Sequence, residues 1–305
     1  MDGVLLLHKP AGMTSHNCVQ KIRQLFRTKK VGHTGTLDPD VSGVLPICIG
    51  KATKVAQYLM SEDKEYVAEV TLGIATETED ASGKVVAQKK VIHPPSRPEV
   101  ERVLKNLLGK IVQVPPMYSA VKVNGKKLYE YAREGKMVNR PKRIVTIFDI
   151  CLRSNIKHEG NTASFSIQVS CSKGTYIRTL AVMIGEQLGY PAHMSHLVRI
   201  RSGRFHLHDC ITFQTVEQFL ENGEFPKGFL TIDNVLNHLP KWTINDTLAR
   251  KVQNGSVLTM PEHLSFIGKD EIIAVWHNQH IIALYQKHPL KANMIKPVKV
   301  MKQDE

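Results

Sequence analysis

Residues 163–188, which read ASFSIQVSC, then SKGTYIR, then TLAVMIGEQL, decide the fold class, because they hold the clearest strand of the chain and a helix directly behind it. Every second residue from Ala163 to Cys171 is apolar and the residues between them are polar, which is the period of a half-buried strand. After Tyr176 apolar side chains recur at helical spacing as far as Leu188, which predicts a helix. Such strand-to-helix units are typical of mixed α/β proteins.

Similar units occupy the first two-thirds of the chain. Short apolar or alternating runs predict strands in three further segments: Val4–Leu7, Val44–Ile49 and Tyr66–Leu72. Apolar residues at helical spacing predict three further helices: one with Ser15 as its N-cap, one from Ala52 to Leu59 and one from Val100 to Leu108. We therefore predict an α/β (α+β) fold with a substantial sheet.

From about residue 239 the pattern changes to short strand-like runs. Ile272–Trp276 and Ile281–Tyr285 are two such runs, and an apparent hairpin turn near Asn278 and Gln279 joins them. We predict that residues 239–305 form a separate, small β-rich domain behind a larger domain of residues 1–238.

Composition indicates a globular protein with a polyanionic partner. Of the 305 residues, 42% are hydrophobic and 23% are charged, which excludes a disordered chain, a collagen and a coiled coil. The net charge of +13 favours nucleic acid as the partner.

Cysteine usage and hydropathy indicate a cytoplasmic protein that binds no membrane. The five cysteines form no Cys-x-x-Cys pair, which argues against a disulfide framework and against a zinc ribbon. The run Val4–Leu7 is too short for a signal peptide, and no stretch approaches the ~20 apolar residues of a membrane span.

The densest polar segment is GHTGTLDP, residues 32–39. It presents a histidine, two threonines and the carboxylate of Asp38 on one loop. Taken alone, Asp38-Pro39 is equally well explained as an ordinary turn. The stretch Gly32–Gly35 also fits the Gly-x-x-Gly clamp of a KH RNA-binding module, but that clamp needs a helix on both sides. The loop by itself leaves a turn and a functional site open.

A second polar segment, SKGTYIR at residues 172–178, joins the clearest strand to its helix. Turns from strand to helix are where α/β proteins place ligand-binding groups, and the amides of a first helical turn favour anions. Taken alone, Arg178 is equally well a solvated charge, and Tyr176 a partly buried rim residue.

Residues 113–143 are strongly basic. They hold eight lysines and arginines against two glutamates, with Tyr118, Tyr129 and Tyr131 among them. Taken alone, such a segment is explained as a solvated basic hairpin.

Taken together, these segments resemble the motif set of the TruB pseudouridine synthases. The resemblance rests on GHTGTLDP, GVLP at 43–46, KEY at 64–66 and SKGTYIRT at 172–179. GVLLLHKPAGMTS at 3–15, YSAVK at 118–122 and GKKLYEYAR at 125–133 fit the same family. The motifs occur in order from about residue 3 to beyond residue 200, and the tail from about residue 240 resembles the PUA-like domain of bacterial members.

The resemblance implies a fold and a reaction. The expected fold is that of the pseudouridine synthases, with a central mixed, largely antiparallel sheet flanked by helices and a small C-terminal PUA-like domain. Members of the family are isomerases that convert uridine 55 in the T-loop of tRNA. They detach uracil from C1′ of its ribose, turn the base and rejoin it through C5. The family uses no metal and no organic cofactor, so we expect none here.

The resemblance also implies roles for single residues. Asp38 would be the catalytic aspartate, and Arg178 would pair with it and keep it ionised. Whether Asp38 attacks C1′, attacks C6 or promotes elimination stays open. Tyr66 would stack on the uracil, with Tyr176 on the other side of the pocket and Leu197 in its wall.

Further residues would contact the RNA around the flipped nucleotide. His33 would fill the gap that the base leaves, and Lys9 and Pro10 would belong to the floor of the site. The basic insertion of residues 113–143 would grip the T-arm through phosphate contacts of Lys122, Lys126, Lys127, Arg133, Lys142 and Arg143. The expected partner is tRNA, bound by a monomer without a guide RNA.

Two other functions stay open from the sequence. An RNA-binding protein or RNA chaperone without chemistry would share the basic insertion and the C-terminal domain. A pseudouridine synthase directed by a guide RNA would share the catalytic motifs.

Overall fold

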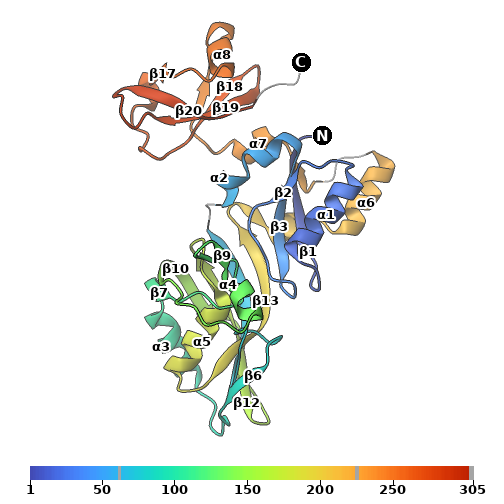
Figure 1. Cartoon of the computed structure of the whole chain (residues 1–305), viewed down its shortest axis with the longest axis vertical. Helices are drawn as coiled ribbons and strands as arrows, with labels where there is room; N and C mark the ends of the chain where they lie inside the picture. Colours follow the sequence, from blue (N-terminus) through green and yellow to red (C-terminus); the bar gives the residue numbers. More distant parts are fainter. Residues whose placement is uncertain (61–62, 224–226, 302–305) are drawn as a thin grey trace.

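The computed structural model describes residues 1–60, 63–223 and 227–301. Within these residues the chain builds an eleven-stranded sheet flanked by helices and, toward the C-terminus, a five-stranded sheet (Figure 1). The predicted mixed α/β fold, with a largely antiparallel central sheet and a β-rich C-terminal part, is confirmed.

Eight strands form the main path of the large sheet. Their order across the sheet is β15 (Phe229–Leu230), β1 (Gly3–Lys9), β3 (Ser42–Ile49), β13 (Ala192–Ser202), β4 (Lys64–Leu72), β12 (Thr162–Cys171), β10 (Arg143–Leu152) and β7 (Gly109–Gln113). Neighbours run antiparallel except β13 and β3, which run parallel, so the sheet is mixed. Three short strands pair beside this path: β2 (Val31–His33) with β3, β11 (Lys157–Glu159) with β12, and β14 (Phe205–His206) with β13.

The central strands follow the alternation that the sequence predicts. Burial alternates residue by residue along β4 and along β12, with the apolar side chains facing the core. Since a shift of one residue would turn the apolar set of a strand outward, this pattern fixes the register of the pairing. Tyr66 on β4 is thereby placed between Val169 of β12 and Arg199 of β13.

The parallel contact between β3 and β13 requires a glycine. Gly43 pairs with Arg199 and has a φ of +120°. A Cβ atom at Gly43 would lie 2.2 Å from the backbone oxygen of Arg199. Any side chain at this position would therefore force the two strands apart.

Helices cover both halves of the large sheet. Figure 1 shows α1 and α6 beside β1, and α3 and α5 beside β10 and β12. The bounds are α1 (Ser15–Leu25), η1 (Gly50–Lys54), α2 (Ala56–Met60), α3 (Arg97–Asn106), α5 (Ile177–Gln187), η2 (Leu207–Asp209), α6 (Phe213–Asn222) and α7 (Ile232–Leu236). The apolar faces of α1, α3 and α5 pack into one core cluster with the large sheet.

The N-cap of α1 differs from the prediction. Thr14, and not Ser15, caps the helix, because the Thr14 hydroxyl accepts a hydrogen bond of 3.0 Å from the N–H of Asn17. Ser15 is the first helical residue, and its hydroxyl contacts Leu37 instead.

Two other predicted helices are shorter than the sequence pattern indicates. The helix α3 ends at Asn106, and Leu108 is exposed, because Gly109 at a φ of +85° turns the chain into β7. The segment predicted as one helix from Ala52 is a 3-10 turn followed by the short α2. The β-branched Val55 separates the two, at φ −107° and ψ −2°.

The five-stranded sheet lies at the top of Figure 1, apart from the large sheet. Its order is β16 (Lys241–Thr243), β18 (Ile273–His277), β19 (His280–Lys287), β20 (Met294–Val300) and β17 (Leu258–Thr259), with α8 (Asp246–Gln253) and η3 (Glu262–Leu264) beside it. The predicted hairpin is confirmed, since Asn278 and Gln279 form its turn with φ values of +47° and +67°. Residues of β18 and β19 also share a core cluster with Val4 and Leu6 of β1. The domain boundary at residue 238 stays a prediction.

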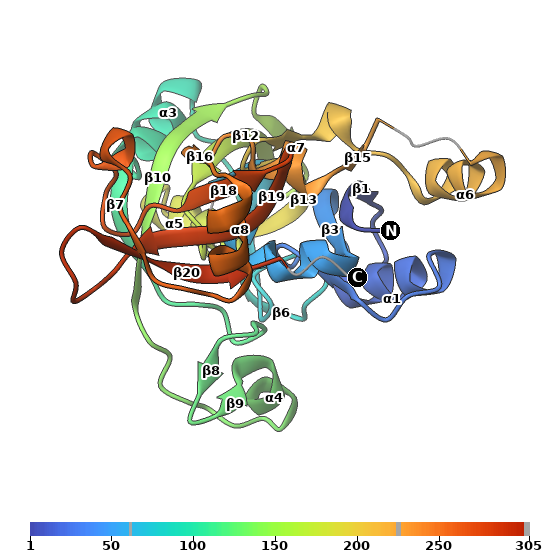
Figure 2. The same cartoon turned by 90° about the horizontal axis from the view of Figure 1, so that it is seen from above.

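The basic insertion stands away from the body of the molecule in Figure 2. It contains the hairpin β8 (Lys122–Val123) and β9 (Lys126–Lys127) and the helix α4 (Leu128–Arg133). A second small hairpin, β5 (Ile74–Thr76) and β6 (Val85–Gln88), follows β4 in the chain. In the part of the chain that the structure describes, no helix combines the length and the apolar character needed to cross a membrane.

Candidate active site

The Asp38 loop, residues 34–41, joins β2 to β3 at the rim of a cavity of about 910 Å³. Asp38 lines this cavity together with Tyr66, Tyr176, Arg178 and Leu197. The structure thus brings together five of the residues singled out from the sequence, which come from β4, β13, α5 and the two loops that precede β3 and α5.

Lys9 holds the Asp38 loop from below. Its side chain is completely buried, and its ammonium donates to the carbonyl oxygens of Pro10, Pro39 and Val41 at 2.8, 2.8 and 2.6 Å. Burial lowers the pKa of Lys9, while the charge of Asp38 acts against that shift. Because an ammonium has three donors and no acceptor, three carbonyls satisfy it completely.

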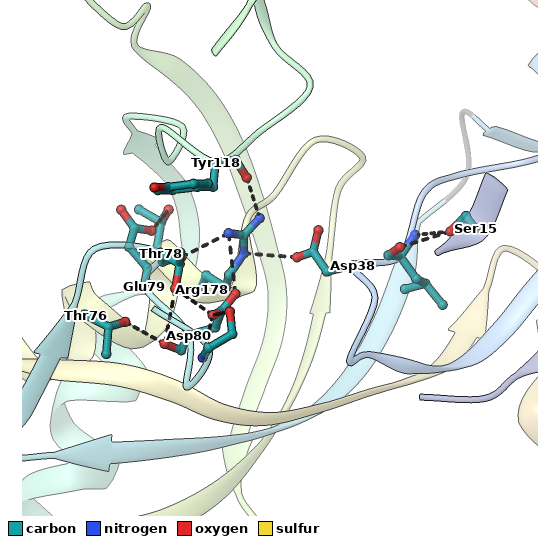
Figure 3. Close-up of polar contacts among 11 residues, drawn as sticks. Ser15, Asp38, Thr76, Thr78, Glu79, Asp80, Tyr118 and Arg178 are labelled. Carbon is teal, nitrogen blue, oxygen red and sulfur yellow. Dashed lines mark hydrogen bonds and ion pairs between the residues drawn. The ribbon is translucent and has the colours of Figure 1, made fainter. Parts of the chain in front are cut away.

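Ser15 fixes the residue before Asp38. The Ser15 hydroxyl donates to the Leu37 carbonyl at 3.0 Å and accepts from the Leu37 N–H at 2.8 Å (Figure 3). Both backbone groups of Leu37 are therefore satisfied by one side chain of α1. This pair of hydrogen bonds sets the direction in which the following residue, Asp38, leaves the loop.

Arg178 lies in the first turn of α5 and binds Asp38. Its Nε lies 3.0 Å from Oδ2 of Asp38, and its other nitrogens donate to the carbonyls of Thr78 and Tyr118 at 3.0 Å each (Figure 3). A second carboxylate, Asp80, lies 3.6 Å from Nη1. Since the Arg178 side chain is 6% exposed, these four contacts hold its guanidinium in one position.

Asp80 is itself held in a tight turn beside Arg178. Its Oδ1 accepts hydrogen bonds from the hydroxyls of Thr78 and Ser82, at 2.7 and 2.6 Å, and from the Ser82 N–H at 3.0 Å. The hydroxyl of Thr76 donates to the Asp80 carbonyl at 2.6 Å. The second carboxylate is thus positioned independently of Asp38.

Opposing influences act on the charge of Asp38, because burial disfavours its ionised form and Arg178 favours it. Burial in the cavity wall raises the pKa of Asp38, and Arg178 acts against this shift but does not cancel it. The neighbouring charge of Asp80 raises the pKa further, and that of Lys9 lowers it. Asp38 is therefore less acidic than an exposed aspartate, although its carboxylate contacts a guanidinium.

Two aromatic residues, Tyr66 and Tyr176, line the cavity. Tyr66 lies on β4 and is 9% exposed, and burial raises the pKa of its hydroxyl. Tyr176 directly precedes α5, where the side-chain amide of Gln113 binds both its N–H and its carbonyl, at 2.9 and 3.1 Å. Leu197 of β13 is 7% exposed and completes an apolar section of the wall.

Comparison with known proteins identifies the family. The model described as "TruB family pseudouridylate synthase (N terminal domain)" matches residues 23–177, and that described as "tRNA pseudouridylate synthase B C-terminal domain" matches residues 178–238. A protein of Bacillus subtilis (strain 168) named "tRNA pseudouridine synthase B" is 58% identical over 304 residues, which cover 99% of this chain and 98% of that protein. A protein of Bacillus licheniformis with the same name is 58% identical over 303 residues, with the same shares of both chains covered.

The chain belongs to the TruB family of pseudouridylate synthases. Among solved structures, this TruB-family chain is similar to one titled "Crystal Structure of a Cbf5-Nop10-Gar1 Complex", at 30% identity and a TM-score of 0.73, with 98% of this chain and 84% of that chain covered. A second, titled "Structure of H/ACA RNP bound to a substrate RNA containing 2'-deoxyuridine", has a TM-score of 0.72 at 27% identity and covers 99% of this chain and 85% of that chain.

Three of the predicted site residues of the TruB-family chain lie beside the cavity without lining it. Lys9 is beneath the Asp38 loop, and Pro10 is exposed next to it. His33 ends β2, and its Nδ1 accepts the N–H of Gly35 at 3.3 Å. Burial and then the charge of Arg199 lower the pKa of His33. The strand at Val31–His33 also removes the helix that a KH clamp would need.

The six basic residues predicted to bind RNA fall into two groups. The side chains of Lys122, Arg133, Lys142 and Arg143 are exposed, and Arg143 also lines the cavity, whereas those of Lys126 and Lys127 are half-buried. Lys126 forms an ion pair with Glu134 and lies over the ring of Tyr131. Lys127 lies over the ring of Tyr129, which also lines the cavity. The insertion therefore meets the cavity at residues 118–120, at Tyr129 and at Arg143.

Arg199, Asp80 and the role of Ser15 were not predicted from the sequence. Arg199 had a signal, because it shares a face of β13 with Leu197 two positions earlier. Asp80 stands in the polar stretch TETEDASG, where an aspartate is easily taken for a turn residue. Across residues 1–60, 63–223 and 227–301, no group of three His, Cys, Asp or Glu side chains is arranged to hold a metal ion.

Proposed function

We propose that this chain isomerises uridine 55 in the T-loop of tRNA to pseudouridine. The observation that most directly supports this proposal is the ion pair of 3.0 Å between Asp38 and Arg178. It lies at the wall of a cavity that Tyr66 and Tyr176 also line. Membership of the TruB family and the names of the Bacillus relatives support the tRNA substrate.

The target base leaves its stack to reach Asp38. A base within a folded loop is not accessible to a carboxylate, and extruding it costs a few kcal/mol of stacking. A cavity of about 910 Å³ has room for the flipped nucleotide, and two aromatic rings offer it apolar contacts. His33, beside the cavity, then fills the gap in the RNA. Lys9 acts indirectly, by keeping the Asp38 loop in place.

The reaction exchanges one bond to C1′ for another. The N1–C1′ bond breaks, the C5–C1′ bond forms, and in the net reaction the proton of C5 is replaced by one on N1. Asp38 acts in its ionised form, as a nucleophile at C1′ or C6 or by promoting elimination. Arg178 orients the carboxylate and favours its ionised form against the effect of burial. No step calls for a metal or an organic cofactor.

The remaining assignments concern the partner RNA and its contacts. The insertion of residues 113–143 binds the T-arm through phosphate contacts, and residues 239–305 act as a PUA-like domain toward the acceptor end of the same tRNA. The enzyme works as a monomer, without a guide RNA, in the cytoplasm. The net charge of +13 supports the polyanionic substrate.

The deciding experiment compares the wild type with Asp38→Asn on a tRNA transcript. We expect the wild type alone to form pseudouridine at position 55 and to release tritium from uracil labelled at C5. The variant should bind the transcript with unchanged affinity and release none, because the substitution removes the reacting carboxylate and keeps the shape of the side chain. Substantial turnover by Asp38→Asn would contradict the assignment.

The same assay separates the alternatives. A protein that only binds RNA releases no tritium at any concentration. An enzyme that depends on a guide RNA leaves an isolated T-arm hairpin unmodified, whereas we expect the wild type to modify this hairpin. Both substrates are tested with purified protein and no other RNA.

A further inference from the structure

The start of α5 is held by a side chain from another part of the large sheet. Tyr176 is the N-cap residue of α5, but its side chain makes no capping hydrogen bond. Instead, Oε1 of Gln113 accepts the Tyr176 N–H at 2.9 Å, and Nε2 of Gln113 donates to the Tyr176 carbonyl at 3.1 Å. One amide group therefore binds both backbone groups of a residue that lies 63 positions away in the chain.

Gln113 is itself held firmly. It is 1% exposed and ends β7, where it pairs with Arg143 of β10. The sheet thus fixes its backbone, and burial restricts its side chain. Its amide fits in one orientation, because the N–H of Tyr176 needs an acceptor and the carbonyl of Tyr176 needs a donor. A hydrocarbon side chain of the same size would make neither hydrogen bond.

The two hydrogen bonds determine how Tyr176 meets the cavity. The N–H and the carbonyl lie on either side of the Tyr176 Cα, so Gln113 sets both peptide planes and the direction of the Cα–Cβ bond. The side chain of Tyr176 is half-buried and lines the cavity, and among the described residues no hydrogen bond holds its hydroxyl. The direction of the ring therefore depends on the backbone that Gln113 holds.

A second contact joins the same two segments in the opposite sense. A few residues beyond Gln113, the Tyr118 carbonyl accepts a hydrogen bond of 3.0 Å from Nη2 of Arg178. Arg178 keeps three further contacts that do not involve Gln113, with Asp38 among its partners. Loss of the Gln113 amide should therefore disturb Tyr176 more than Arg178.

We infer that Gln113 is a positioning residue that holds Tyr176 against the flipped uracil. This inference rests on the proposed function. Gln113 does not line the cavity, so it acts through Tyr176 and not on the RNA. Once the N1–C1′ bond is broken, the base has to turn before C5 can meet C1′. A ring that is fixed on one side of the base limits the orientations that the base can take.

The test is a double-mutant cycle between positions 113 and 176. Single-turnover rates at saturating enzyme and tRNA affinities are measured for the wild type, Gln113→Met, Tyr176→Leu and the double variant. We expect Gln113→Met to lower the rate ~10- to 100-fold when Tyr176 is present. Combined with Tyr176→Leu, it should lower the rate less than ~3-fold. The affinity should stay unchanged on substitution of Gln113, because Gln113 is buried and cannot contact the RNA.

Gln113→Asn is the second variant. It keeps a polar amide but is one carbon–carbon bond shorter, so it cannot reach both backbone groups of Tyr176 from the same strand position. We expect the same loss of rate, again only when Tyr176 is present. This variant carries the cycle if Gln113→Met does not fold.

Tyr190→Phe is the matched control at the other end of α5. The Tyr190 hydroxyl donates to the His93 carbonyl at 3.1 Å, over 97 positions in the chain, and Tyr190 does not line the cavity. The substitution removes a long-range hydrogen bond from a side chain to the backbone beside the same helix and should leave the rate at the wild-type value. Urea unfolding curves accompany every variant.

Three results would overturn the inference. Equal rate losses from Gln113→Met with and without Tyr176→Leu would show that Gln113 does not act through Tyr176, and a wild-type rate for Gln113→Met would remove any role. A loss of the same size in Tyr190→Phe would assign the effect to the stability of α5. A wild type that forms no pseudouridine would instead refute the proposed function, which the first measurement of the series settles separately.

Discussion

The environment of Asp38 disfavours the ionised form of its carboxyl group. Its side chain is 42% exposed and contacts Arg178, and yet burial raises the pKa of its carboxyl. An aspartate in solution has a pKa of ~3.9. The carboxylate form that the proposed reaction needs is therefore lost at a higher pH than in an exposed aspartate. The placement of Asp38 thus serves the proposed reaction at a cost to the stability of the fold.

The sign of this shift gives a prediction for Asp38→Asn. A carboxyl whose pKa is raised in the folded state destabilises the fold at pH values above that pKa, where it is ionised, and the cost disappears as the pH falls through it. We expect the variant to be at least as stable as the wild type at pH 7.5. Its advantage should shrink toward pH 4. Urea unfolding at both pH values measures the difference.

The opposite pH trend would contradict this interpretation. If the wild type lost stability relative to the variant as the pH fell, the contact with Arg178 would outweigh burial and the pKa of Asp38 would be lowered. The single-turnover rate of the wild type between pH 4.5 and 8 gives an independent check, because its acid limb should lie above that of an ordinary carboxylate.

The residues of the site differ in how far the sequence reveals them. Asp38 and Arg178 are far apart in the chain, so no local pattern pairs them, and only the resemblance to a family placed them together. Lys9 and Arg199 were hard to interpret, because lysine and arginine are almost never fully buried and both are here. Their burial depends on carbonyl groups that only the folded loop brings near.

At the scale of single elements, periodicity predicts the interior better than the ends. The alternation along β4 and β12 is visible in the sequence and sets their register. The N-cap of α1 lies one residue before the predicted one, since Thr14 and Ser15 are both good caps and the tertiary contact to Leu37 decides between them. The end of α3 also differs from the prediction, because the apolar pattern continues past its last helical residue.

The start of α1 yields a prediction with a built-in control. Ser15→Ala removes both hydrogen bonds to the Leu37 backbone and should lower the single-turnover rate several-fold, because Asp38 follows Leu37 directly. The stability loss should be about 1–3 kcal/mol, since two buried backbone groups of Leu37 are left unsatisfied. Rate and urea unfolding are both measured.

Thr14→Ala provides the comparison. It removes the exposed N-cap of the same helix, which should cost about 1 kcal/mol of stability. Its rate should stay at the wild-type value, because the Thr14 hydroxyl hydrogen-bonds Asn17 and not the Asp38 loop. Equal rate losses in the two variants would show that the stability of α1, and not the direction of Leu37, limits catalysis.

At the scale of the whole molecule, the insertion carries charge away from the body of the fold (Figure 2). Its basic residues are not equivalent, because Lys122 is exposed while Lys126 is paired with Glu134. Arg178 also binds the carbonyl of Tyr118, near the start of this insertion. The guanidinium that orients Asp38 therefore also positions the segment proposed to hold the RNA.

The difference between the two lysines is testable in the salt dependence of binding. Lys122→Ala should weaken tRNA binding and reduce the slope of log K against log salt concentration by ~1, as expected for one lost phosphate contact. Lys126→Ala should change the slope less, since its charge is already neutralised by Glu134. Binding is measured over a series of salt concentrations, and identical slopes for both variants would contradict the distinction.

The position of β13 has a consequence for a chain that is still being synthesised. This late strand lies between the earlier β3 and β4, and it brings Arg199, while α5 just before it brings Arg178. A ribosome-bound chain that ends before residue 178 already contains Asp38, but neither arginine. The large sheet has no middle strand to complete it at that stage. The nascent chain thus lacks the pair of Asp38 and Arg178 until most of its length has left the ribosome.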